Sequence, residues 1–235
     1  IYGLQYRDLA IPEDAALPSR MSDFLAYFIS PLTALQTDRQ HIIGHSSGGA
    51  LAFLLAIELQ QMGQHVPLLG IMDNIPPVRS DPTRTPVTMS HLQWSARAVR
   101  MAQALLNVET GQEMVARLSE LPESAFWEAV FDLFDKHSFL SGEDGVMYVK
   151  QRARFFQAMQ QCLNSYELGA KYAGQLILFR ATKPALPDPD PLVAKWKAVC
   201  EKPIVVHHLP CIHGDMGRAP YINQVGELFQ QHICE

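Results

Sequence analysis

A serine framed by glycines is the clearest chemical signal in this sequence. The stretch Gly44-His45-Ser46-Ser47-Gly48 matches the pattern G-x-S-x-G, in which a strand turns sharply into a helix and presents a serine hydroxyl as a nucleophile. Only one frame fits, because centring the pattern on Ser47 would put His45 where the first glycine belongs. Ser46 is therefore the candidate nucleophile. The backbone N–H of Ser47, at the start of the helix, is the natural oxyanion donor.

The flanks of this motif have the strand and helix patterns that it requires. His41-Ile42-Ile43 is a short β-branched run, typical of a strand in a buried parallel sheet. Apolar residues then recur at helical spacing from Ala50 to Met62, and Gly63 stands where a helix C-cap would end that helix. Glycines beside the serine would let neighbouring chain pass close to a strained turn. The pattern therefore predicts a nucleophile elbow.

A serine hydroxyl attacks well only when an imidazole takes its proton and a third group fixes the imidazole tautomer. The chain has 9 histidines. His45 lies inside the motif but is expected to point away from the hydroxyl, and His207 and His208 alternate between the faces of a predicted strand. His213 follows that last strand in a loop, on the sheet edge where Ser46 should emerge. We therefore expect His213 to be the base.

Several aspartates compete for the third role. Asp73 directly follows an apolar run beside the nucleophile strand, while Asp188 and Asp190 lie in a Pro-rich loop after the later strand 175–180. All three keep the chain order Ser, acid, His. Asp73 is preferred because a right-handed crossover puts its strand next to that of the serine. Asp215 is the least favoured candidate, since a residue so close in the same loop seldom turns its carboxylate onto the ring.

The elements that must position these residues alternate between strand and helix, which predicts an α/β fold with a mostly parallel sheet. Strands are expected at 1–6, 41–43, 66–73, 175–180 and 204–209, and helices at 21–37, 50–62, 192–199 and 221–233. Pro31 is expected to kink or divide the first helix. From residue 80 to 166 the pattern is helical throughout, and this stretch is far longer than one crossover needs. We predict a core formed by 1–79 and 167–235 with a helical lid inserted at 80–166.

Composition excludes several other classes of protein. The 235 residues are 48% hydrophobic and 18% charged, and the net charge of -5 with no basic run argues against a nucleic-acid partner. No stretch is long and apolar enough for a membrane span, and no signal peptide pattern is present. The 4 cysteines lack metal-ligand spacing. We therefore expect a cytoplasmic chain with reduced thiols, no metal and no membrane partner.

These residues resemble the thioesterase domains that end nonribosomal peptide synthetases, within the α/β-hydrolase superfamily. The resemblance rests on the opening Ile1-Tyr2-Gly3-Leu4-Gln5, the elbow at 44–53, the strand Leu69–Asp73 and the stretch Trp196–His213. Ser46 and Asp73 are also separated as in that family. Family members have a further strand before the opening segment, followed by a loop that supplies the second oxyanion donor. We therefore expect the N-terminal strand region to be missing from this chain.

The resemblance implies a reaction on a thioester held by the 4′-phosphopantetheine arm of a carrier domain, with no cofactor bound to the chain itself. Ser46, His213 and Asp73 would form an acyl-enzyme that releases its acyl or peptidyl chain by hydrolysis or macrocyclisation. Three alternatives stay open at this stage. They are a stand-alone type II editing thioesterase, a related esterase or lipase, and a non-catalytic member that binds a ligand under the lid.

Overall fold

The computed structural model describes residues 2–4, 17–35, 37, 39–77, 90–106, 117–118, 120–137 and 141–234, and the statements below refer to these residues. The chain forms two compact units. One unit comprises residues 22–80 and 166–235, and it contains a sheet. The other comprises residues 1–21 and 81–165, and its described elements are helices.

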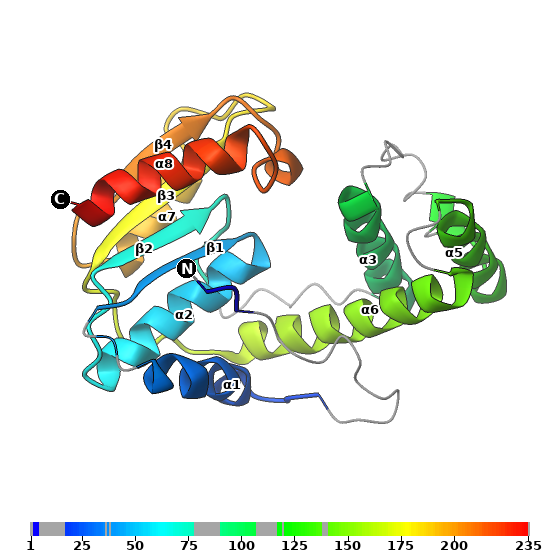
Figure 1. Cartoon of the computed structure of the whole chain (residues 1–235), viewed down its shortest axis with the longest axis horizontal. Helices are drawn as coiled ribbons and strands as arrows, with labels where there is room; N and C mark the ends of the chain where they lie inside the picture. The colour runs from blue at the N-terminus through cyan, green and yellow to red at the C-terminus, as the bar shows by residue number, and fades with distance from the viewer. Residues whose placement is uncertain are drawn as a thin grey trace. The chain divides into compact units, whose positions relative to one another are not determined.

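The sheet unit has four parallel strands in the spatial order β1-β2-β3-β4 (Figure 1). The strands are β1 (His41–His45), β2 (Leu68–Met72), β3 (Gln175–Ala181) and β4 (Val205–Leu209). Helices α1 (Met21–Ala34), α2 (Ser47–Gln61), α7 (Pro191–Val199) and α8 (Tyr221–Cys234) accompany them, with the short 3₁₀ helix η1 (His213–Asp215) after β4. The α/β class with a parallel sheet is as the sequence predicted.

The register makes β1 and β2 end side by side, while β3 and β4 run two residues further. His45 of β1 pairs with Met72 of β2, which pairs with Phe179 of β3, which pairs with His207 of β4. Because parallel strands point the same way, the residues that follow these four positions emerge at one edge of the sheet. That edge receives the turns after β1 and β2.

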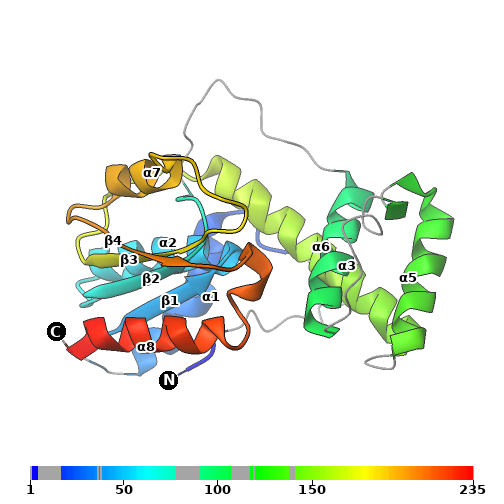
Figure 2. The ribbon, with the colours of Figure 1, turned by 90° about the horizontal axis from the view of Figure 1, so that it is seen from above.

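Helices cover both faces of this sheet, with α2 and α7 on one face and α8 on the other (Figure 2). Phe53 of α2 and Trp196 of α7 are fully buried, and their rings meet edge to face with centroids 5.1 Å apart. On the opposite face, Val225 and Phe229 of α8 pack against apolar side chains of β2, β3 and β4. A parallel sheet buried on both faces needs apolar residues throughout, as β2 has.

Two local expectations from the sequence concern the first helix and the N-terminus. The expected division of the first helix is corrected, because Pro31 lies inside α1 and does not divide it, while a kink stays a prediction. The proline removes one hydrogen bond near the end of the helix, and the burial of Phe28 and Leu32 on either side holds the last turn in place. At the N-terminus, Tyr2–Leu4 belong to no strand, and the remainder of the predicted strand at 1–6 lies outside the described residues.

The helical unit packs α6 (Gly142–Ser165) against α3 (His91–Leu106) and α5 (Glu123–His137). Serine caps start two of these helices, and the first cap is reciprocal. Ser90 Oγ accepts from Gln93 N–H while Ser90 N–H donates to Gln93 Oε1, and Ser141 caps α6 through Asp144 N–H. The predicted boundaries and the role of 80–166 as a lid stay predictions. No described helix is long and apolar enough to cross a membrane.

We predict opposite effects of adding a methyl group at the two glycines of the motif. A Cβ on Gly44 would overlap the carbonyl of Gly48, whereas a Cβ on Gly48 would meet no atom within 4 Å. Gly44→Ala should therefore lower the free energy of unfolding by about 2 kcal/mol or more. Gly48→Ala should be neutral or stabilising, because alanine favours the helix.

Urea denaturation of both variants tests this prediction, with the parent chain as reference. Equal destabilisation by the two substitutions would contradict it.

Candidate active site

Ser46 occupies the turn between β1 and α2 in strained backbone geometry. Its φ of 53° and ψ of -126° lie in a region that non-glycine residues rarely adopt. Its backbone N–H donates to the carbonyl of Met72 at 3.0 Å, so the sheet ladder continues into the turn. Ser47 is the first residue of α2, and its N–H therefore has no acceptor within the helix.

Asp73 stands at the same position on the neighbouring strand. Its N–H donates to the carbonyl of Phe179 at 2.8 Å, and its φ of 50° turns the chain immediately after β2. The carboxylate is about 10% exposed. Its Oδ1 accepts from the backbone N–H of Ala181 at 3.3 Å and from the guanidinium of Arg180. This carboxylate is therefore held by both backbone and side-chain donors.

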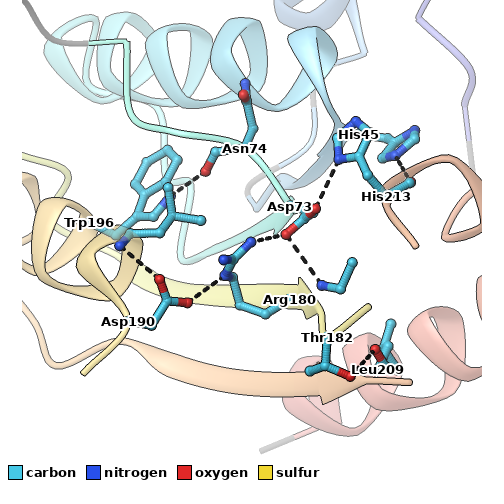
Figure 3. A network of polar contacts seen from close by, with 11 residues as sticks. His45, Asp73, Asn74, Arg180, Thr182, Asp190, Trp196, Leu209 and His213 are labelled. Atoms are coloured by element: carbon cyan, nitrogen blue, oxygen red, sulfur yellow. Dashed lines mark hydrogen bonds and ion pairs between the residues drawn. The ribbon is translucent and has the colours of Figure 1, made fainter. Parts of the chain in front are cut away.

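His213 begins η1, after the short loop that follows β4, and meets the second oxygen of that carboxylate. Its Nδ1 lies 2.9 Å from Asp73 Oδ2 (Figure 3). Since an ionised carboxylate only accepts, Nδ1 carries the hydrogen in the neutral ring and Nε2 keeps a lone pair. The side chain is 44% exposed. An imidazole held in this tautomer can act as a general base.

His45 contacts the same loop. Its Nε2 lies 3.2 Å from the carbonyl oxygen of His213, to which it donates, and the two rings are tilted with centroids 5.0 Å apart. Burial and the neighbouring His213 lower the pKa of His45, although the bond to the carbonyl opposes this. Its ring therefore faces the candidate base, a contact that the sequence did not predict.

The hydroxyl of Ser46 makes no hydrogen bond to His213 or to any other described residue. The structure thus brings Asp73 and His213 together and puts Ser46 beside Asp73 on the sheet edge. It does not form the bond between hydroxyl and imidazole. Catalytic hydrogen bonds are often open without substrate and tighten only in the complex.

The sequence did not single out Arg180, which organises the polar contacts behind the acid. It is buried and lies in β3 after four apolar residues. Its Nε donates to Asp190 Oδ2 at 2.7 Å while its Nη1 binds Asp73 (Figure 3). A basic residue at the end of a buried strand, on the edge that carries the site, was the available signal.

The other candidate acids lie elsewhere. Asp190 binds Arg180 and caps α7, Asp188 is exposed, and Asp215 lies within η1 without a described contact to the ring of His213. His207 pairs with His232 of α8, with their Nε2 atoms 3.1 Å apart. Among the described residues, no group of three or more histidine, cysteine or acidic side chains could hold a metal ion.

Electrostatics keep both buried carboxylates charged. Burial by itself would raise the pKa of Asp73, but the hydrogen bond to His213 and the charge of Arg180 outweigh it, and the net effect lowers the pKa. The same balance holds for Asp190, where the bonds from Arg180 and from Leu192 N–H overcome burial and lower the pKa.

These shifts predict how stability depends on pH. A carboxyl with a lowered pKa in the folded chain contributes stability that is present above its ordinary value and is lost as pH falls through the lowered value. The free energy of unfolding should therefore fall as pH drops below about 4. Asp73→Asn should flatten this fall, because one titrating carboxyl is gone.

Urea denaturation at neutral pH and at about pH 3 measures the slope. Asp188→Asn, at an exposed position, should leave the slope as in the parent chain. A slope in Asp73→Asn equal to that of the parent would contradict the prediction.

Comparison with known sequences gives a family match over nearly the whole chain. A family model described as Thioesterase domain matches residues 1–230. The chain is 24% identical over 195 residues to chondramide synthase of Chondromyces crocatus, which covers 83% of this chain and 5% of the synthase. It is also 24% identical over 244 residues to the dimodular nonribosomal peptide synthase of Bacillus subtilis (strain 168), covering 100% of this chain and 9% of that protein. The chain thus spans less than a tenth of each of these relatives.

Solved structures share the fold. The Vlm2 thioesterase domain superposes with a TM-score of 0.65 at 22% identity, covering 95% of this chain and 80% of that one. A four-domain nonribosomal peptide synthetase gives a TM-score of 0.73 at 18% identity, covering 96% of this chain and 17% of that one. The predicted fold class and family are confirmed: the chain belongs to the thioesterase domain family.

Proposed function

We propose that the chain is a terminal thioesterase domain that releases an acyl or peptidyl chain from the phosphopantetheine arm of a carrier domain in a nonribosomal peptide synthetase. The family membership supports a hydrolase acting on thioesters. The matches to a segment of a dimodular nonribosomal peptide synthase and to part of a four-domain nonribosomal peptide synthetase favour a carrier-bound substrate. The observation that carries the proposal is the 2.9 Å contact of His213 Nδ1 with Asp73 Oδ2, on the edge where Ser46 occupies its strained turn.

In the first half of the proposed reaction, Ser46 Oγ attacks the thioester carbonyl carbon while His213 Nε2 accepts the hydroxyl proton. Asp73 holds the ring through Nδ1 and stabilises the imidazolium that forms. The carbonyl oxygen becomes an oxyanion, which the free N–H of Ser47 is oriented to receive at the start of α2. Collapse breaks the carbon–sulfur bond, and the departing thiolate takes the proton from His213. An acyl-enzyme remains on Ser46.

In the second half, a nucleophile attacks the acyl-enzyme and His213 again accepts its proton. Water as the nucleophile releases a free acid, whereas an amine or hydroxyl of the bound chain releases a ring. Ser46 then takes its proton back from His213 as the ester bond breaks. Because both nucleophiles need the same base, access of water to the acyl-enzyme determines which product forms.

The nucleophile assignment predicts covalent labelling at one residue. A fluorophosphonate probe should label Ser46, and Ser46→Ala should abolish labelling and acyl transfer. Ser47→Ala provides the matched control, because it retains the backbone N–H and leaves Ser46 in place. Peptide mapping by mass spectrometry locates the label, and labelling that persists in Ser46→Ala would overturn the assignment.

The acid assignment predicts unequal effects of three isosteric changes. Asp73→Asn should lower kcat roughly 1000-fold or more, because the ring loses its tautomeric support and its counter-charge. Asp188→Asn and Asp215→Asn should each change kcat less than about threefold, since neither contacts the ring in the described structure. Steady-state kinetics on an acyl-pantetheine thioester compares them. A larger loss at Asp188 or Asp215 would give the role to that residue.

The substrate class is tested by products. Peptidyl and short acyl thioesters of pantetheine, each with a matched oxygen ester, separate the proposed function from its alternatives. Preference for peptidyl thioesters supports a terminal thioesterase, and mass spectrometry of the products distinguishes acids from rings. Preference for short acyl thioesters would point to an editing enzyme, preference for oxygen esters to an esterase, and binding without turnover to a non-catalytic member.

A further inference from the structure

One guanidinium joins two carboxylates behind the proposed active site. Arg180 binds Asp73 through Nη1 and Asp190 through Nε, the latter at 2.7 Å. All three side chains are nearly buried, with exposed fractions of 11%, 10% and 9%. Two buried carboxylates sharing one guanidinium carry a net charge of -1 as a group, and each depends on the arginine for its counter-charge.

Each carboxylate also makes a second contact with its other oxygen. Asp73 Oδ2 faces His213 Nδ1 at 2.9 Å, and Asp190 Oδ1 accepts from Leu192 N–H at 2.9 Å as the N-cap of α7. A continuous series of hydrogen bonds therefore runs from the start of α7, through the guanidinium, to the imidazole (Figure 3). A displacement at any member would move the next.

Helix α7 also contacts the turn after β2 directly. Trp196, fully buried in α7, donates from Nε1 to the carbonyl of Asn74 at 2.6 Å. Asn74 directly follows Asp73, so the turn that carries the acid is held by α7 through its backbone as well as through Arg180. The planar, two-sided donor geometry of arginine suits this bridging position, and a lysine could supply only a point charge.

We propose that Arg180 and Asp190 form a clamp that positions the Asp73 carboxylate and sets the charge that His213 meets. Arg180 is thus a positioning residue that acts through Asp73, and Asp190 partly neutralises the charge of Arg180. This inference rests on the proposed function only where it concerns turnover. The clamp's effect on the imidazole is a property of the folded chain and can be measured without substrate.

The clamp predicts shifts of opposite sign for its two members. Removing the positive charge of Arg180 leaves the full negative charge of Asp73 facing His213, which favours the protonated ring. Removing the negative charge of Asp190 lets the whole charge of Arg180 act on Asp73, which disfavours the protonated ring. The other titratable groups around this site are His45, beside the ring, and Cys211, which lies within the influence of Asp73, Asp215 and Lys183. They are unchanged in all variants.

The experiment follows protonation of the His213 ring by NMR in the full chain. Arg180→Met should move the titration midpoint to higher pH by about half a unit or more, and Asp190→Ser should move it to lower pH. Serine retains the N-cap of α7, so the second variant removes charge without removing the cap. Asp188→Ser, in the same loop but exposed, is the matched control and should leave the midpoint as in the parent chain.

Turnover provides a second measurement. Arg180→Met should lower kcat on a pantetheine thioester roughly 10- to 100-fold with little change in KM, because the acid and base are misplaced while substrate binding is untouched. Arg180→Lys retains the positive charge, so the midpoint should stay near that of the parent chain. Its kcat should still fall, because lysine cannot bridge both carboxylates. If Arg180→Met does not fold, the downward midpoint shift of Asp190→Ser tests the charge effect, and the lowered kcat of Arg180→Lys at a midpoint near that of the parent tests the positioning.

The clamp would be overturned if the midpoints of Arg180→Met and Asp190→Ser moved in the same direction, or if either midpoint equalled that of the parent chain. If the parent chain hydrolyses thioesters and Ser46→Ala does not, the proposed function stands whatever the midpoints do. If the parent chain shows no turnover, the proposed function fails, while opposed midpoints would still support the clamp.

Discussion

Parallel strand register is the constraint on which the site depends. His45, Met72 and Phe179 form one row across three strands, and the ladder continues one residue further. The N–H of Ser46 donates to the Met72 carbonyl, and the N–H of Asp73 donates to the Phe179 carbonyl. A slip of one residue between these strands would turn every side chain to the opposite face. The relative positions of Ser46 and Asp73 are therefore properties of the sheet.

Strain and buried charge concentrate at the ends of these strands. Ser46 and Asp73 are the non-glycine residues with positive φ in the described structure, and such conformations persist only where the surroundings impose them. For Ser46, glycine at position 44 permits the close approach to the Gly48 carbonyl that accompanies the turn. For Asp73, donors from His213, Arg180 and Ala181 meet the carboxylate and offset the cost of burying its charge. Rigid positioning of acid and base results.

Local patterns determined much of this structure. Alternation of apolar strands and amphipathic helices indicated the α/β class, and the motif around Ser46 indicated the elbow, because such turns depend on residues adjacent in the chain. Placing Asp73 immediately after its strand, and His213 in the loop past the last strand, was also a local inference. The parallel topology then brought them to one edge, and the pair lies in contact as expected, although the catalytic roles stay proposals.

Contacts between distant segments could be decided only by the tertiary structure. The sequence left Asp188 and Asp190 open as acids, and only packing of α7 against the turn at Asn74 directs Asp190 to Arg180 instead of to the imidazole. The ring of His45 faces His213 for the same kind of reason, across 168 positions of chain. Local sequence thus indicated which groups are the candidates for the chemistry and where each strand ends. The pairing of the charged side chains depended on packing, because a side-chain contact is determined by distance in space and not by separation along the chain.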